Sequence, residues 1–307
     1  MAFNVSAVTG YVQANEKTLI AKSILKAKTA SLVGFQPNVK GSAQINLLTG
    51  DATLQKGGCG WTSAGTTTLS KRNIVTGMLK VNEDLCEKDL VGTFAEWGVA
   101  QGVGKTSLPF EQYITDAKVK SVQKQVEIGL WQADMDNTGY TGTYLKEFDG
   151  LIKIIGAEVS VVDATLTGST LAAAPITAIN AIVAKIPNEV IDADDLTIFT
   201  GYDILRAYVA AYNASNQFAG TLMLDGATMS VTVPNTNIKL EGVAGLTGKN
   251  LAYATPASNI RVGGDMEGDE SKFKFWYSED NSTYRLKIEF NVGVQVAFPD
   301  YIVKYTN

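Results

Sequence analysis

The most recognisable chemical pattern in this sequence is GVGKTS, at residues 102–107. Glycines followed by a lysine and a hydroxyl residue resemble the end of a P-loop, the backbone cradle that holds nucleotide phosphates. A P-loop also needs a glycine five residues before Gly104, where this chain has Val99. Pro109 follows at once, where the first turn of a phosphate-binding helix should run. We therefore interpret the stretch as a turn and not as a nucleotide site.

Carboxylates are grouped in two places, and the first has the start of a calcium-binding pattern. Asp134 and Asp136 have the spacing of the first ligands of an EF-hand loop. Thr138, however, holds the third ligand position, and Leu145 stands where the bidentate glutamate belongs. We expect no calcium site there.

The second group, Asp192, Asp194 and Asp195, precedes an apolar run. A pair of carboxylates acting as acid and base would need one of them in an apolar pocket, and three acids on a solvated loop are the commoner explanation. The 307 residues include no histidine, which removes the usual general base near neutral pH, the Ser-His and Cys-His pairs and most zinc sites. We predict that the protein is not an enzyme and has no catalytic, cofactor-binding or metal-binding residue.

Two cysteines and two lysines offer covalent chemistry. Cys59 and Cys86 are separated by a segment rich in glycine and threonine. They either meet at the base of a hairpin and form a disulfide after leaving a reducing compartment, or are two unrelated reduced thiols. Lys56 and Lys71 are candidates for a covalent cross-link to a neighbouring chain, with solvated side chains as the simpler interpretation.

Composition and charge describe a folded, soluble protein made in a cytosol. Hydrophobic residues make up 45% of the chain and charged residues 19%, as in globular domains. Acidic residues outnumber basic ones by 31 to 26, and a net charge of −5 without a basic tail argues against a dedicated nucleic-acid reader. We find no signal peptide, and no apolar stretch approaches the ~18 residues of a membrane span.

The elements that must position any site are organised around a long helix predicted over residues 108–133. Pro109 suits a first helical turn, and no other proline interrupts the segment. Its apolar residues form two stripes, which predicts a helix buried on two sides. One stripe is Tyr113, Ile114, Ala117, Ile128 and Trp131, and the other is Val119, Val122, Val126 and Leu130.

Three segments of different composition precede this helix. A helix is expected over residues 9–30, with a basic face that either lies on a neighbour or an anionic surface or is simply solvated. Residues 41–82 are rich in Gly, Thr and Ser and alternate weakly. They predict a long β-hairpin with few buried residues that must rest on something else, such as another subunit. A short helix is expected over residues 82–97.

After the long helix, apolar patterning predicts an α/β region and then strands. A helix over 175–187, a buried strand over 196–200 and a helix over 203–212 imply a sheet flanked by helices. A long strand is predicted over 284–298, where every second residue is apolar. Shorter strands are predicted over 231–233, 238–240, 251–255 and 272–277.

In the order of these elements and in the sequence of particular stretches, the chain resembles the major capsid proteins of tailed bacteriophages, which have the Hong Kong phage fold. FDGLI at 148–152 looks like the entry from the spine helix to the axial domain. The core of that domain is similar to PITAINAIVAKIPNEVIDADDLTIFTGYDILRAYVAAYN at 175–213. The return to the peripheral sheet is similar to NLAYATPASNIRVGGDME at 250–267 and KFKFWYSEDNSTYRLKIEFNVGVQVAFPDYIV at 272–303. CGW at 59–61 and KVNEDLCEK at 80–88 resemble capsid proteins of phages that infect Bacteroidetes.

The resemblance implies an α+β fold, the Hong Kong phage-type major capsid fold, in five parts. Residues 1–40 would form an N-terminal arm, 41–82 an extended β-hairpin loop, 83–150 a peripheral domain with the spine helix, 151–261 an axial domain, and 262–307 the return strands to the peripheral domain. The acidic net charge agrees with a shell that encloses DNA without binding it tightly.

The function implied is that of a structural subunit. It would self-assemble as hexamers and pentamers into an icosahedral virion capsid around double-stranded DNA, in the host cytoplasm. The implied partners are copies of itself, portal and scaffolding or decoration proteins, and packaged DNA bound without sequence specificity; no cofactor and no membrane is implied. We expect no scaffold domain fused to this chain. The alternative is an encapsulin-like cargo compartment of the same fold, which a docking groove for a cargo peptide would distinguish. A tail-tube subunit would be β-dominated, and the helices near Ile176 and Tyr202 argue against it.

Overall fold

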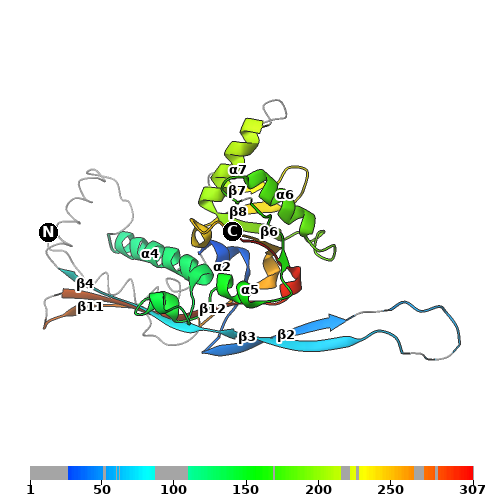
Figure 1. Cartoon of the computed structure of the whole chain (residues 1–307). Helices are drawn as coiled ribbons and strands as arrows, with labels where there is room; N and C mark the ends of the chain where they lie inside the picture. The colour runs from blue at the N-terminus through cyan, green and yellow to red at the C-terminus, as the bar shows by residue number, and fades with distance from the viewer. Residues whose placement is uncertain are drawn as a thin grey trace.

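The computed structural model describes residues 27–50, 53–59, 61, 63–86, 110–168, 170–215, 222–225, 228–265, 273–280 and 283–306. They form a mixed α+β molecule with two β-sheets and a separate two-stranded hairpin (Figure 1). Two hydrophobic cores, one beside each sheet, contain most of the buried apolar residues that the structure describes. Among the described residues, no helix has the length and hydropathy that a transmembrane segment needs.

The first sheet is built around β12 (Thr283–Val296). β12 pairs antiparallel with β4 (Gly77–Cys86) along one edge, and with β11 (Phe273–Ser278) and then β10 (Ile260–Gly264) along the other. β1 (Gly34–Gln36) joins β10 in parallel. Alternate residues of β12 are buried along its whole length, so the predicted long strand is confirmed.

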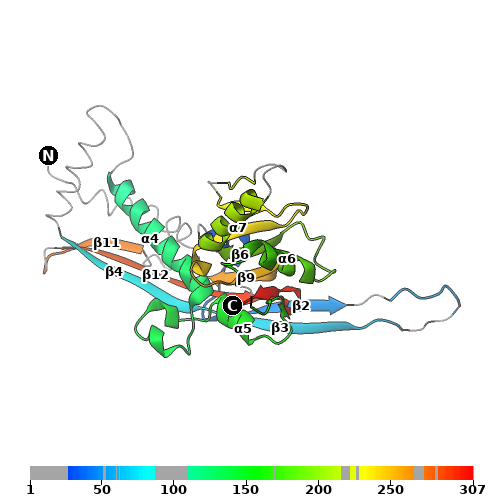
Figure 2. The ribbon, with the colours of Figure 1, turned by 45° about the horizontal axis from the view of Figure 1, so that its top comes forward.

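The predicted long helix is α4 (Phe110–Gln132), which lies beside the first sheet (Figure 2). Its buried apolar residues belong to the core of that sheet. One predicted stripe is buried throughout and consists of Val119, Val122, Val126 and Leu130. The other stripe is covered only near the C-terminal end of the helix, where α2 (Lys28–Leu32) and the 3-10 turn η3 (Ala244–Leu246) contact α4. Trp131 is fully buried there, whereas Ala117 is exposed. Burial on two sides is therefore confirmed for the last turns and wrong at Ala117, because no described element covers that face of the helix at this position.

The second sheet has its six strands in the order β5-β13-β9-β6-β8-β7. These strands are β5 (Val162–Asp163), β6 (Leu196–Gly201), β7 (Ser230–Thr232), β8 (Lys239–Val243), β9 (Ala252–Pro256) and β13 (Val303–Tyr305). α6 (Pro175–Lys185) and α7 (Tyr202–Ser215) share the core of this sheet, which confirms the predicted helix, buried strand and helix. β13 pairs with β9, so the closing segment of the chain belongs to the second sheet.

Short elements connect the two sheets. α4 is followed by the 3-10 turns η1 (Thr138–Tyr140) and η2 (Tyr144–Lys146) and by α5 (Leu151–Ala157). η4 (Ala257–Asn259) joins β9 to β10, and η5 (Pro299–Tyr301) joins β12 to β13. Each of the last two turns therefore carries the chain from one sheet to the other.

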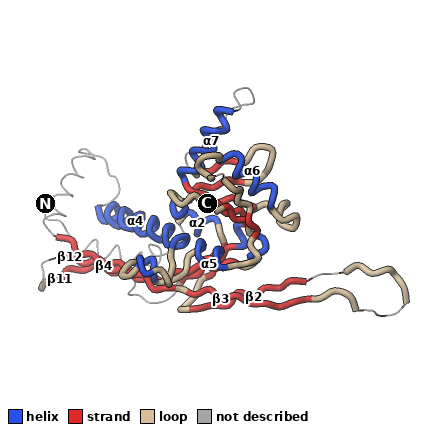
Figure 3. Tube along the Cα trace, viewed as in Figure 1, coloured by secondary structure: helices blue, strands red, loops and turns tan. Residues whose placement is uncertain are grey.

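β2 (Ser42–Gly50) and β3 (Thr67–Val75) form an antiparallel hairpin that projects from the rest of the molecule (Figures 1 and 3). Most of its residues are exposed, which confirms the predicted long hairpin with few buried residues.

The extended loop ends earlier than the predicted residue 82, because β4 begins at Gly77 and pairs with β12 in the first sheet. The helix predicted over 82–97 is wrong for residues 82–86, since these residues pair with β12 and their burial alternates from one residue to the next, as in a strand. Residues 87–97 lie outside the described residues, as do residues 9–26 of the helix predicted over 9–30.

A close approach of two backbones fixes the base of the hairpin. A Cβ on Gly293 of β12 would lie 2.1 Å from the carbonyl oxygen of Val75. We expect Gly293→Ala to lower the free energy of unfolding by about 2–3 kcal/mol, because both strands are held by their sheets and overpacking forces them apart. Equilibrium urea unfolding followed by circular dichroism measures the change.

Gly156→Ala is the matched control for this substitution. Gly156 is exposed on α5, with no atom near the position of an added Cβ. Alanine there should stabilise the helix by about 0.5–1 kcal/mol, the opposite sign. Similar effects of both substitutions would contradict the close approach at the hairpin base.

Candidate interaction site

The hairpin carries apolar side chains that its own chain leaves in solvent. Leu48 and Leu69 are directly opposite each other in the register and are 64% and 77% exposed. Beyond the paired residues, Leu54 and Trp61 are 100% and 95% exposed. Scattered exposed apolar residues are ordinary, but these four lie on one projecting segment and include a tryptophan. The hairpin is therefore a candidate interaction site.

The base of the hairpin, in contrast, is anchored to the body. Ile74 is fully buried. Arg72 forms an ion pair with Glu158, and the side-chain amide of Gln295 on β12 donates a 2.9 Å hydrogen bond to the carbonyl of Asn73. These contacts set the direction in which the hairpin leaves the body. The exposed strand residues Leu48 and Leu69 are thus preorganised, which reduces the entropy lost on binding a partner.

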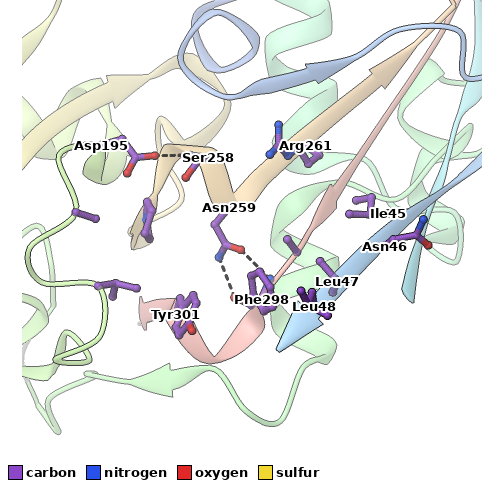
Figure 4. Close-up of a pocket in the computed structure, with 14 residues that line it drawn as sticks. Ile45, Asn46, Leu47, Leu48, Asp195, Ser258, Asn259, Arg261, Phe298 and Tyr301 are labelled. Atoms are coloured by element: carbon purple, nitrogen blue, oxygen red, sulfur yellow. Dashed lines mark hydrogen bonds between the residues drawn. The ribbon is translucent and has the colours of Figure 1, made fainter. Parts of the chain in front are cut away.

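A groove of about 490 Å³ lies between the hairpin and the second sheet (Figure 4). Ile45 and Leu48 contribute from β2, Ala193 from the loop between α6 and β6, and Phe298 from the segment after β12. The side chain of Asn259, which also lines it, is satisfied within the chain: its amide nitrogen donates to the Phe298 carbonyl at 2.8 Å, and its oxygen accepts from the Phe298 N–H at 2.7 Å. The groove has the size of known ligand pockets, and much of its wall is apolar.

A buried polar cluster lies where α2, α4 and the second sheet meet. Glu127 on α4 is 3% exposed and accepts hydrogen bonds from the N–H of Thr29 at 2.8 Å and from its hydroxyl at 2.5 Å. The indole N–H of Trp131 donates to the same hydroxyl oxygen at 2.7 Å. Next to Thr29, Lys28 forms a 2.8 Å ion pair with Glu241 on β8. The cluster therefore joins α2 to the long helix and to the second sheet.

This cluster predicts a pH dependence of stability. Desolvation raises the pKa of Glu127 above its ordinary value of 4.5, against the lowering effects of the Thr29 hydrogen bonds and the charge of Lys28. The folded state thus holds this proton more tightly than the unfolded state does. The resulting contribution to stability is fully present below a pH of about 4.5 and is lost as the pH rises through the folded-state pKa.

Glu127→Gln cannot ionise and should remove this dependence. We expect the free energy of unfolding of the wild type, minus that of Glu127→Gln, to fall as the pH rises from about 5 to about 8. Urea unfolding of both proteins across that range measures the difference. A difference independent of pH would show that Glu127 keeps an ordinary pKa in the fold.

The acids considered as the start of a calcium loop surround a lysine instead. The ammonium of Lys153 lies 2.8 Å from a carboxylate oxygen of Asp134, 2.6 Å from one of Asp136 and 2.8 Å from one of Asp149. It occupies the position between the carboxylates that a cation would take, and its hydrogen bond lowers the pKa of Asp134. Within the described part of the chain, no group of three or more His, Cys, Asp or Glu residues has the arrangement of a metal site.

The second acidic group remains on a loop. Asp192 and Asp194 are exposed. Asp195 is half-buried, which opposes its charge, but hydrogen bonds from Ser258 lower its pKa; the one from the Ser258 N–H is 2.7 Å long. The P-loop-like stretch at 102–107 lies outside the described residues.

The two cysteines are free, exposed and far from each other along the molecule. Cys59 lies between β2 and β3, whereas Cys86 is the last residue of β4, at the opposite end of the molecule (Figure 1). The interpretation that they meet at the hairpin base is therefore wrong within one chain, because β4 runs away from that base along β12. Lys56 and Lys71 are both exposed on the hairpin.

No protein-family model and no curated protein matches this sequence. Solved structures match it over nearly its whole length. A chain of the satellite phage P4 procapsid, in a structure including the size determination (Sid) protein, has a TM-score of 0.61 at 11% identity over 95% of this chain and 90% of that one. A chain of Gordonia phage Cozz has a TM-score of 0.58 at 11% identity, over 91% and 86%. A chain of the virus-like particle from Pyrococcus furiosus has a TM-score of 0.51 at 8% identity, over 94% and 96%. The protein therefore has a mixed α+β fold that also occurs in phage and virus-like particle structures.

Proposed function

We propose that this chain is a structural shell subunit that assembles as hexamers and pentamers into an icosahedral capsid enclosing double-stranded DNA. The observation that carries the proposal is the hairpin, which is firmly anchored at its base and leaves Leu54 and Trp61 without a partner among the described residues. A fold that also occurs in a phage procapsid supports the same interpretation.

The two sheets support an assignment of the chain to the parts of the Hong Kong phage-type fold. We assign the first sheet and α4 to the peripheral domain, residues 83–150 with the return strands 262–307. The second sheet, with α6 and α7, corresponds to the axial domain, residues 151–261. The hairpin is the extended loop of residues 41–82, and residues 1–40 are the N-terminal arm. In this assignment β4 extends the peripheral domain into residues 77–82, and β13 adds a strand to the axial domain.

The proposed partners follow from the shell. They are further copies of the chain, portal and scaffolding or decoration proteins, and packaged DNA that the acidic protein encloses without sequence-specific binding. The protein would be assembled in the cytoplasm of its host, a bacterium of the Bacteroidetes, and remain in the virion capsid without catalysing a reaction.

Size-exclusion chromatography with light scattering tests the proposal. We expect the purified chain to elute as assemblies of many times 32.8 kDa. A species that stays at 32.8 kDa at high protein concentration, even when a scaffolding protein from the same source is added, would overturn the proposed shell function.

The alternative function is an encapsulin-like cargo compartment, which the fold shared with the Pyrococcus furiosus virus-like particle keeps open. The contents of particles from the native source separate the two functions. A capsid should protect double-stranded DNA from nuclease, whereas a cargo compartment should contain a specific protein and no protected DNA.

A further inference from the structure

The groove between the hairpin and the second sheet contains one charged group that the chain itself does not use. Two of the residues that line it are charged, Asp195 and Arg261. Asp195 accepts hydrogen bonds from Ser258, one of them a 2.7 Å bond from its N–H, and Figure 4 shows its carboxylate directed at that residue. Arg261 forms no hydrogen bond or ion pair with any residue that the structure describes. The charge that the groove offers to a ligand is therefore positive.

Packing against a neighbouring strand positions the Arg261 side chain. In the register of the first sheet, Arg261 of β10 lies between Gly34 of β1 and Gln295 of β12. A Cβ on Gly34 would lie 2.9 Å from Cζ and 3.0 Å from Cδ of Arg261, so the arginine lies across backbone that carries no side chain. The amide of Gln295 donates to the carbonyl of Asn73 instead. The guanidinium is thus positioned without an acidic partner, and its N–H donors remain available to a ligand.

The rest of the groove favours a hydrocarbon chain over a peptide. Ile45 and Leu48 of β2 and Phe298 form apolar wall, and Leu48 is 64% exposed. The side chain of Asn259 is fully engaged with the backbone N–H and carbonyl of Phe298. The groove therefore offers few hydrogen-bond partners to a peptide backbone, whose buried N–H and C=O groups need them. An unbranched hydrocarbon chain needs none.

We infer that the groove binds an amphiphile with an unbranched apolar chain and a terminal carboxylate, the chemistry of a medium-chain fatty acid. The carboxylate accepts two parallel hydrogen bonds from Arg261, as the forked guanidinium group allows, and the chain covers Leu48 and Phe298. The volume of about 490 Å³ is in the range of small-molecule sites. Because Leu48 belongs to the hairpin and Phe298 to the segment after β12, the bound ligand also holds the hairpin against the body.

Isothermal titration calorimetry of the full-length chain tests the inference with three probes below their micelle concentrations: decanoate, octanoate and the neutral 1-octanol. Arg261→Gln removes the cation and keeps a polar side chain of similar length. The matched control is Arg206→Gln, which makes the same change of charge at an exposed position of α7, away from the groove. Leu48→Ser removes part of the apolar wall at a position where the side chain is mostly in solvent.

We expect the wild type to bind decanoate about tenfold more tightly than octanoate, because the chain has two more methylene groups to bury. Arg261→Gln should weaken the binding of both carboxylates by at least about tenfold and that of 1-octanol by less than about twofold, since only the carboxylates use the charge. Leu48→Ser should weaken all three, and Arg206→Gln none.

Two results would overturn the inference. One is a wild type that binds no decanoate, or binds it equally well after Arg261→Gln and Arg206→Gln. The other is a Leu-Leu-Phe peptide with a free carboxylate that binds more tightly than decanoate, which would assign the groove to a peptide. Each leaves the shell function untouched, because the titration does not depend on assembly.

Discussion

Replacing Trp131 by alanine is expected to lower the free energy of unfolding by about 3–5 kcal/mol, the range for deleting a large aromatic side chain from a core. Trp131 is fully buried on α4, and its ring lies 5.8 Å from that of Tyr253 and 5.6 Å from that of Phe199, centroid to centroid. It also donates the hydrogen bond to Thr29. The substitution therefore removes contacts that join the long helix to both the second sheet and α2. Urea unfolding at low protein concentration, where assembly is absent, measures the loss.

Two further substitutions distinguish the contribution of burial from that of the hydrogen bond to Thr29. Trp276→Ala is the matched control, because Trp276 is 37% exposed on β11 and its truncation should cost less than about 1.5 kcal/mol. Trp131→Phe keeps an aromatic ring but leaves Thr29 without this donor, so we expect a loss of about 1–2 kcal/mol. An equal loss of stability from Trp131→Ala and Trp276→Ala would contradict the role of Trp131 in joining α4 to the second sheet and to α2.

The double substitution Leu54→Ser with Trp61→Ser should raise the protein concentration needed for assembly while leaving the subunit folded. Both side chains are almost fully exposed, so the free energy of unfolding should change by less than about 0.5 kcal/mol. If a neighbour buries them, each contributes about 1.5–3 kcal/mol to the contact between subunits. Loss of both raises the protein concentration needed for assembly by at least about tenfold, since each 1.4 kcal/mol is a factor of ten. Light scattering against protein concentration measures this threshold.

The control for this substitution is an exposed apolar residue elsewhere. Met223 is 83% exposed and lies between α7 and β7, away from the hairpin. Met223→Ser should leave the assembly threshold unchanged. A threshold that rises equally in both proteins would mean that the hairpin has no special part in assembly, and unfolding of the double variant would mean that its two residues support the monomer.

The parts of the fold that could be predicted from the sequence are those with a local signal. The long helix shows its Val119 to Leu130 stripe at helical spacing, β12 alternates strictly, and the helix that begins at Pro175 is bounded by prolines. The hairpin was predictable from the opposite property, a segment with too few apolar residues to form a core. For the two helices and β12, the pattern that identifies the element is also the pattern that buries it.

The elements that were missed depend on distant partners. The sequence predicts a helix for part of β4, because the identity of β4 as a strand comes from pairing with β12, about two hundred residues later in the chain. β1 and β10 are short and gain their place only by pairing with each other and with β12. Ala117 is apolar and in phase with Trp131, yet only the end of that face of α4 is covered by another described element.

The candidate site also has parts that the sequence predicts and parts that it does not. That the hairpin needs a partner was predicted from its composition, whereas the groove was not, because its walls come from β2, the loop before β6 and the segment after β12. The cluster around Glu127 was also missed. A single glutamate on a helix usually faces solvent, and only the contact with Thr29 of α2 makes its burial possible.

Negative-stain electron microscopy of the purified chain tests the central claim most directly. The exposed apolar end of an anchored hairpin should bring subunits together in closed shells, or in rings of five and six before closure. We predict that such particles are visible for the wild-type chain and absent for the Leu54→Ser, Trp61→Ser variant. A uniform field of particles no larger than a 32.8 kDa monomer, at high protein concentration and with a scaffolding protein co-expressed, would contradict the claim that this chain builds a shell.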